Sequence, residues 1–161
     1  MEKVSLSDIR KELSFANKEE LVSICLRMAR LKKENKEHLA YLLFSKDETV
    51  FIAEINQEVT LAMHDLRNIN TFQAKKVLQK TLRTITKNKK FCLSKVYEME
   101  VMLHFVREME QKKVPYSSSS YLFQFYAKQV IKLGKILPGL DEDLQTDYQS
   151  EVEELCARIS F

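Results

Sequence analysis

Apolar residues recur along most of the chain at intervals of three and four positions, the spacing of a helix that buries one face. The clearest case starts after Asp47 and carries Ile52, Ile55, Val59, Ala62, Met63 and Leu66. The same pattern predicts helices over about 7–14, 17–32, 35–45, 48–66, 70–88, 94–113, 120–137 and 141–160. No segment alternates in the way of a half-buried strand, so no strand is predicted.

Polar residues mark where these helices begin and end. Asn70 is followed three positions later by Gln73, the arrangement of a capping box, and Asn17 stands in the same relation to Glu20. A turn is expected at 89–93. Pro115 with the run at 117–120 predicts a loop, and Pro138 with Gly139 predicts the end of the helix over 120–137.

The segments 94–113 and 120–137 are apolar around more than half of the helix circumference. A helix of this kind is covered on several sides, so these two are expected at the centre, with single-faced helices such as 17–32 around them. The fold expected is one all-α domain over 1–161, with about seven or eight antiparallel helices arranged as a bundle or a short α-α superhelical array.

The composition argues against several classes of enzyme. Two glycines in 161 residues cannot supply the glycine-rich loops that nucleotide sites require. The three cysteines form no C-x-x-C pair, and no known catalytic or metal motif includes His38, His64 or His104. We expect His104 to be a hydrogen-bonded core residue. The prediction is a protein that is not an enzyme, with no catalytic residue, metal site or cofactor.

The charges are unevenly distributed, although the net charge is only +3. Nine basic residues and no acidic one lie between Asp65 and Glu98, while the segment from Asp141 to Glu154, with both ends counted, has seven acidic residues and no basic one. The chain therefore has a basic central helix and an acidic C-terminal helix.

Spacing places five of the cations together. Lys76, Lys80, Arg83, Lys87 and Lys90 follow one another at steps of four and three, so they share one side of the helix, called here the basic face. The opposite side carries Ala74, Leu78, Leu82 and Ile85, which should be buried.

The basic face has three interpretations. It is a solvated helix surface, or it binds an acidic protein surface, including the acidic C-terminal helix of the same or another copy, or it binds nucleic-acid phosphates. Phosphate binding by all five cations predicts a salt-dependence slope of about −4. Few aromatic residues lie among these cations, which weakens the nucleic-acid interpretation because stacking is a usual part of such sites.

The function expected is therefore a non-catalytic protein–protein interaction module that uses the basic face, with nucleic-acid binding as the alternative. No membrane partner is expected, because no apolar run is long enough to span a bilayer. The N-terminus has no apolar run of the signal-peptide kind, so the expected location is the cytoplasm.

Three passages carry a resemblance: KEELVSICLRMARLKKENKEHLAYLLF, KKVLQKTLRTITKNKK and VYEMEVMLHF. Together they span about 18–105 and resemble small all-helical bacterial proteins to which no activity is assigned. The resemblance implies a cytoplasmic bacterial helical protein and carries no site residues.

Overall fold

The computed structural model describes residues 4–44, 47–66, 68–113 and 120–159. Over these residues the chain is all-α, as predicted, with eight α-helices, one short 3₁₀ helix and no strand. The elements are α1 (Leu6–Phe15), α2 (Lys18–Leu31), α3 (Lys33–Phe44), α4 (Glu48–Ala62), α5 (Thr71–Cys92), α6 (Lys95–Gln111), α7 (Tyr121–Ile136), η1 (Leu137–Gly139) and α8 (Glu142–Ile159). No helix in these ranges is both long and apolar enough to cross a membrane.

The chain divides into two compact units. The first, Met1–Lys46, contains α1 to α3, and the second, Asp47–Phe161, contains α4 to α8. The expectation of one domain over 1–161 stays a prediction.

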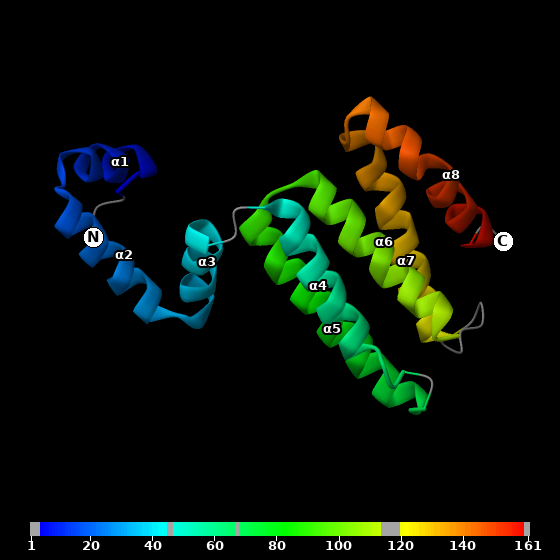
Figure 1. Cartoon of the computed structure of the whole chain (residues 1–161). Helices are drawn as coiled ribbons and strands as arrows, with labels where there is room; N and C mark the ends of the chain where they lie inside the picture. The colour runs from blue at the N-terminus through cyan, green and yellow to red at the C-terminus, as the bar shows by residue number, and fades with distance from the viewer. Residues whose placement is uncertain (1–3, 45–46, 67, 114–119, 160–161) are drawn as a thin grey trace. The chain divides into compact units, whose positions relative to one another are not determined.

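The core of the second unit is built around α6 and α7. α6 packs against α4, α5 and α7, while α7 also packs against α8 (Figure 1). Ten residues of α6 and seven of α7 are buried, which confirms that the two broadly apolar helices are central. The segment over 17–32, expected to flank them, packs as α2 against α3 in the first unit.

Tyr97 of α6 ties three helices together. Its ring stacks on Phe51 of α4 with centroids 5.7 Å apart, and its hydroxyl donates to the Ile85 carbonyl of α5 at 3.2 Å. Because the hydroxyl is fully buried, this hydrogen bond removes the cost of an unsatisfied polar group. The contact fixes the side of α5 that faces the core.

The first two helices of the first unit are well capped, but the unit as a whole buries little of its surface. Asn17 and Glu20 form the predicted capping box at the start of α2, and Ser5 with Asp8 forms another at α1. α2 and α3 pack against each other, yet none of the residues described in this unit is buried.

Two element boundaries differ from the prediction. α5 continues through the expected turn to Cys92, because Phe91 is buried and Lys89 pairs with Glu98, so the last turn has tertiary support. α4 ends at Ala62, four residues early, although Met63 and Leu66 are buried in the turn that follows. The predicted loop at Pro115 and Ser117–Ser119 lies outside the described residues.

Candidate binding surface on α5

The candidate surface is carried by the longest helix of the chain, whose ends are fixed by local hydrogen bonds. At the start of α5, the Gln73 amide donates to Asn70 Oδ1 at 2.9 Å, and the Asn70 amide donates to Gln73 Oε1 at 3.4 Å. At the end, Leu93 adopts a left-handed conformation and its amide donates to the Lys89 carbonyl at 3.1 Å. A continuous helix keeps the intervals of three and four residues on one side over its whole length.

The orientation of α5 is largely as predicted. Ala74, Leu78 and Ile85 are buried on the side opposite the basic face. Leu82 is only half-buried, because it lies at the border with α7 and not over the core; its prediction as a buried residue was wrong. Thr81 is buried too, which its polar side chain did not indicate.

The basic face is on the surface. Lys76, Lys80, Arg83 and Lys90 are exposed, and Lys87 is partly so. Lys89 lies on another side of the helix, where its ammonium is 2.6 Å from the buried carboxylate of Glu98.

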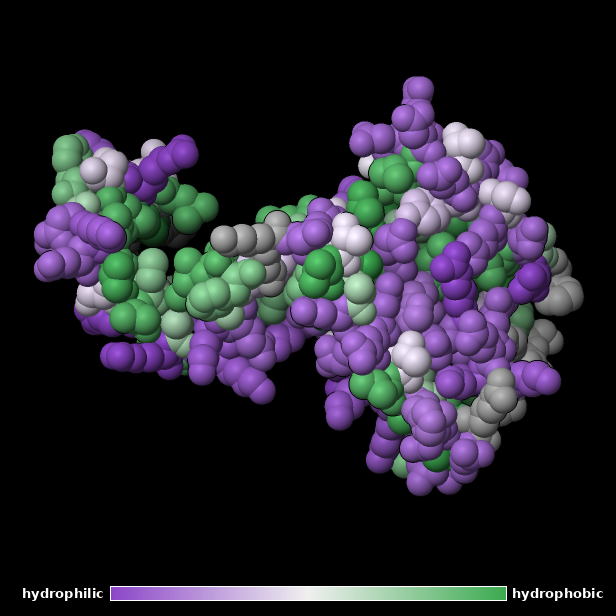
Figure 2. Space-filling view, in the orientation of Figure 1, coloured by the Kyte–Doolittle hydropathy of each residue, from purple (hydrophilic) through white to green (hydrophobic). Residues whose placement is uncertain are grey.

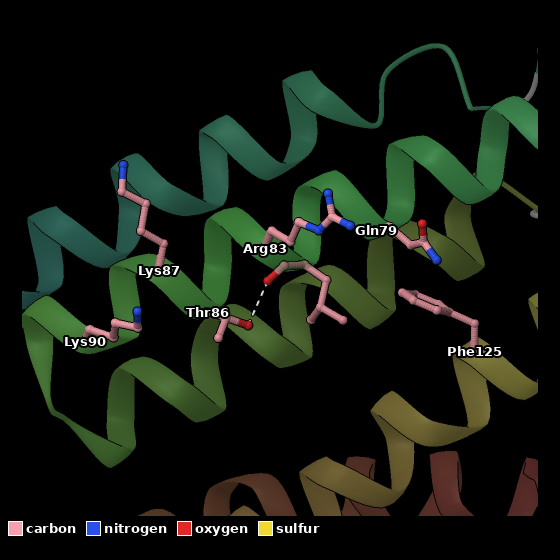
Figure 3. Close-up of a pocket in the computed structure, with 7 residues that line it drawn as sticks. Gln79, Arg83, Thr86, Lys87, Lys90 and Phe125 are labelled. Carbon is pink, nitrogen blue, oxygen red and sulfur yellow. Dashed lines mark hydrogen bonds between the residues drawn. The ribbon is translucent and has the colours of Figure 1, made fainter. Parts of the chain in front are cut away.

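A groove of about 470 Å³ runs along α5 beside α7 (Figure 3). It is lined by Gln79, Leu82, Arg83, Thr86, Lys87, Lys90 and Phe125. The Leu82 and Phe125 side chains make an apolar wall, and three of the five predicted cations border it. None of the lining residues described is acidic, so the groove combines positive charge with apolar surface.

The N-terminal half of the basic face is organised differently. Lys76 lies over the ring of Phe72, its ammonium 4.4 Å from the ring centroid, and neither Lys76 nor Lys80 borders the groove. Beside them, Lys75 lies over the ring of Tyr121 at 4.2 Å, and Gln79 Nε2 donates to the Tyr121 hydroxyl at 2.9 Å. These two contacts join the start of α7 to α5.

Nearly half of the acidic residues of the C-terminal segment face α6 or its neighbours on α8. Arg107 of α6 binds Glu151 through two hydrogen bonds, and Arg158 lies 2.8 Å from Glu110 and 3.8 Å from Glu154. In the part of the chain that the structure describes, α8 packs extensively on α7 and α5 packs extensively on α4 and α6, so α8 of a second copy is the form of self-association to test. The exposed acidic group available for it is Asp141, Glu142, Asp143 and Asp147.

His104 belongs to a polar cluster between α4 and α6. Its Nε2 lies 2.8 Å from the Thr60 hydroxyl, which also donates to Glu108 Oε1 at 3.1 Å. Burial lowers the pKa of His104, against the opposing effect of the Glu108 carboxylate. His104 is hydrogen-bonded as the sequence indicates, although it is half-buried and not fully in the core. Thr60 was missed because a pairing across 44 positions has no local signal, whereas Glu108 lies four positions after His104, a helical spacing that the sequence does show. In the described part of the chain, no three His, Cys, Asp or Glu side chains come together as metal ligands.

Comparison with known proteins adds no assignment: no family model, curated protein or solved structure matches the chain. The resemblance to small bacterial helical proteins stays a prediction.

Proposed function

We propose that this protein is a non-catalytic interaction module whose basic face binds an acidic segment of a partner protein. The observation that carries the proposal is the groove between α5 and α7, in which Arg83, Lys87 and Lys90 border an apolar wall. Carboxylates of the partner would meet the cations, and an apolar side chain of the partner would cover Leu82 and Phe125. The proposed site of action is the cytoplasm, the location expected from the sequence.

The groove favours a protein partner over single-stranded nucleic acid. Binding of single strands relies on aromatic rings that are open for stacking. Phe91 is buried and does not line the groove, Phe125 contributes only a small exposed part of its ring to the lining, and the Lys76 ammonium lies over one face of the exposed Phe72 ring. Nucleic-acid binding through the same five cations is therefore the alternative that the experiment must separate.

The experiment measures the affinity of the full chain for two labelled probes, an acidic peptide with interspersed leucines and a DNA duplex, over a salt series. The triple variant Lys80→Glu, Arg83→Glu and Lys87→Glu should weaken peptide binding by at least about tenfold. The triple variant Lys11→Glu, Lys128→Glu and Lys135→Glu changes the net charge equally at exposed positions outside the groove and should bind as the unchanged protein does.

Three outcomes would contradict the proposal. Tighter binding of DNA than of the peptide, with a slope of about −4 against salt, would favour nucleic acid. Light scattering tests self-association. A mass that doubles at low salt and falls back to that of one chain at high salt, and does so only when the basic face is intact, would identify the partner as α8 of a second copy. No binding of either probe would make the basic face a solvated helix surface.

A further inference from the structure

The first unit exposes apolar side chains that a folded unit normally covers. Leu43 and Phe44 of α3 are 58% and 79% exposed, and large apolar residues of α1 and α2 are exposed as well. Green, apolar side chains are correspondingly frequent on the surface of this unit in Figure 2. A contiguous exposed apolar patch marks an interaction site.

The patch is hollowed between α2 and α3. A groove of about 670 Å³ lies there, and its apolar lining is Leu26, Ala29, Leu39, Ala40, Leu43 and Phe44. Its charged lining is Arg30, Lys32, Lys33 and Lys36, with no carboxylate among the lining residues that the structure describes. Lys33 lies 3.9 Å from Glu37 at an exposed position, where such a pair contributes little and leaves the cation available.

A second, smaller hollow on α2 has the same chemistry. It has a volume of about 330 Å³ and is lined by Ile24, Arg27, Met28, Arg30 and Leu31. Arg30 borders both hollows, so the C-terminal half of α2 has positive charge between two apolar surfaces.

The dimensions and the charge indicate the occupant. α3 has 12 residues, which corresponds to a groove about 18 Å long, or about three turns of a bound helix. An amphipathic helix fills such a groove with apolar side chains at positions i, i+3 or i+4, and i+7. A second copy of the same groove would bring cations against cations, which is unfavourable. Nucleic acid would use the cations and leave the apolar lining exposed.

We infer that the α2–α3 groove is a docking site for an acidic amphipathic helix of a partner protein. The apolar side chains of that helix lie on Leu26, Leu39 and Leu43, and its flanking carboxylates meet Arg30, Lys32 and Lys36. This site is separate from the basic face of α5, so the inference goes beyond the proposed function and does not rest on it.

The test uses a labelled synthetic helix of about 15 residues, with leucine at the spacing of one face and glutamate on both sides of it. Its fluorescence anisotropy is measured against the full chain. We expect saturable binding with a Kd in the micromolar range, weakened at least tenfold in the variant Lys32→Glu, Lys36→Glu and equally in Leu43→Asp. A version of the peptide with lysine in place of glutamate should bind at least tenfold more weakly.

Two control variants isolate the groove. Arg10→Glu with Lys11→Glu makes the same charge change on α1, outside the groove, and should leave the Kd unchanged. The triple variant of the α5 basic face should also leave it unchanged, which separates a failure of this site from a failure of the proposed function. Far-ultraviolet circular dichroism checks that every variant keeps its helical content.

The inference fails if the peptide does not bind the full chain, or if it binds the groove variants as tightly as the unchanged protein. It also fails if sedimentation detects a dimer that Leu43→Asp dissociates, because a second copy then occupies the groove. A third outcome is that the protein does not bind the peptide but sediments with phosphatidylserine vesicles. If Leu43→Asp abolishes this sedimentation, the groove binds a lipid surface and the inference fails.

Discussion

The two units have similar apolar periodicity and opposite burial. In the first unit, Ile24 and Met28 of α2 lie on the same helix face and both are exposed. In the second, Ile55 and Val59 of α4 have an equivalent spacing and both are buried. Apolar periodicity therefore specifies a helix and its apolar face, but it does not specify which other element, if any, buries that face.

The covering depends on the number of helices that meet. The second unit surrounds α6 and α7 with three further helices, whereas the first unit has two packed helices and a short third one. A unit of 46 residues is near the size below which a chain buries too little surface for independent stability. Burying a leucine contributes about 1.5–3 kcal/mol, and little of this is realised in α1 to α3. The partner helix proposed above would supply the apolar cover that the first unit does not provide within itself.

The largest expected contrast concerns leucine truncation. Leu103 of α6 is 0% exposed, so Leu103→Ala leaves a cavity and should lower the free energy of unfolding by about 2–5 kcal/mol. Leu42 of α3 is 64% exposed, so Leu42→Ala should change it by no more than about 0.5 kcal/mol. Urea denaturation followed by circular dichroism measures both. Equal losses would show that the first unit is covered in solution and would end the contrast.

The features that could be predicted from the sequence lie within single segments, and those that could not depend on packing between segments. The helices, the central place of α6 and α7 and the shared side of the five cations could be predicted, because each depends on spacing within one segment. The groove beside the basic face could not, since Phe125 reaches it from α7 through packing between helices. The groove of the first unit was missed for the same reason: Leu39 and Leu43 have a core pattern, but the described helices of this unit leave both of them lining an open groove.

A second contrast concerns the ion pairs. Glu98 of α6 is 4% exposed and lies 2.6 Å from Lys89 and 3.8 Å from Lys132, so it joins α5, α6 and α7. Changing both lysines to methionine leaves a buried carboxylate without compensation. The expected loss is about 3 kcal/mol, the lower end of the range for a broken buried pair, because the lysine side chains are partly exposed.

The matched change in the first unit is Lys33→Met, which removes the exposed pair with Glu37. An effect of about 0–1 kcal/mol is expected in the same urea titration. A loss as large as that of the second-unit variant would mean that Lys33 is enclosed by a neighbour in solution. A double variant of Lys89 and Lys132 as stable as the unchanged protein would show that these ion pairs do not contribute to stability.

The smallest effect is a pH dependence of stability that arises from His104 in the second unit. Burial holds the pKa of His104 below its ordinary value of 6.5, while Glu108 and Glu100 act against this shift and Arg107 adds to it. As pH falls below about 6.5, the unfolded chain therefore binds the imidazole proton before the folded chain does. Stability is lost over this interval and levels off below the folded-state pKa.

Replacing His104 by glutamine keeps a donor near Thr60 and removes the titration. Between pH 7 and pH 5, the free energy of unfolding of His104→Gln should fall less steeply than that of the unchanged protein. The matched variant His64→Gln, at an exposed position of the second unit, should retain the steeper fall. Parallel curves for His104→Gln and the unchanged protein would mean that the cluster of Thr60, His104 and Glu108 admits the proton in the folded state. The polar cluster between α4 and α6 would then be accessible to water, as the side chains of the first unit are, even though it lies in the second unit.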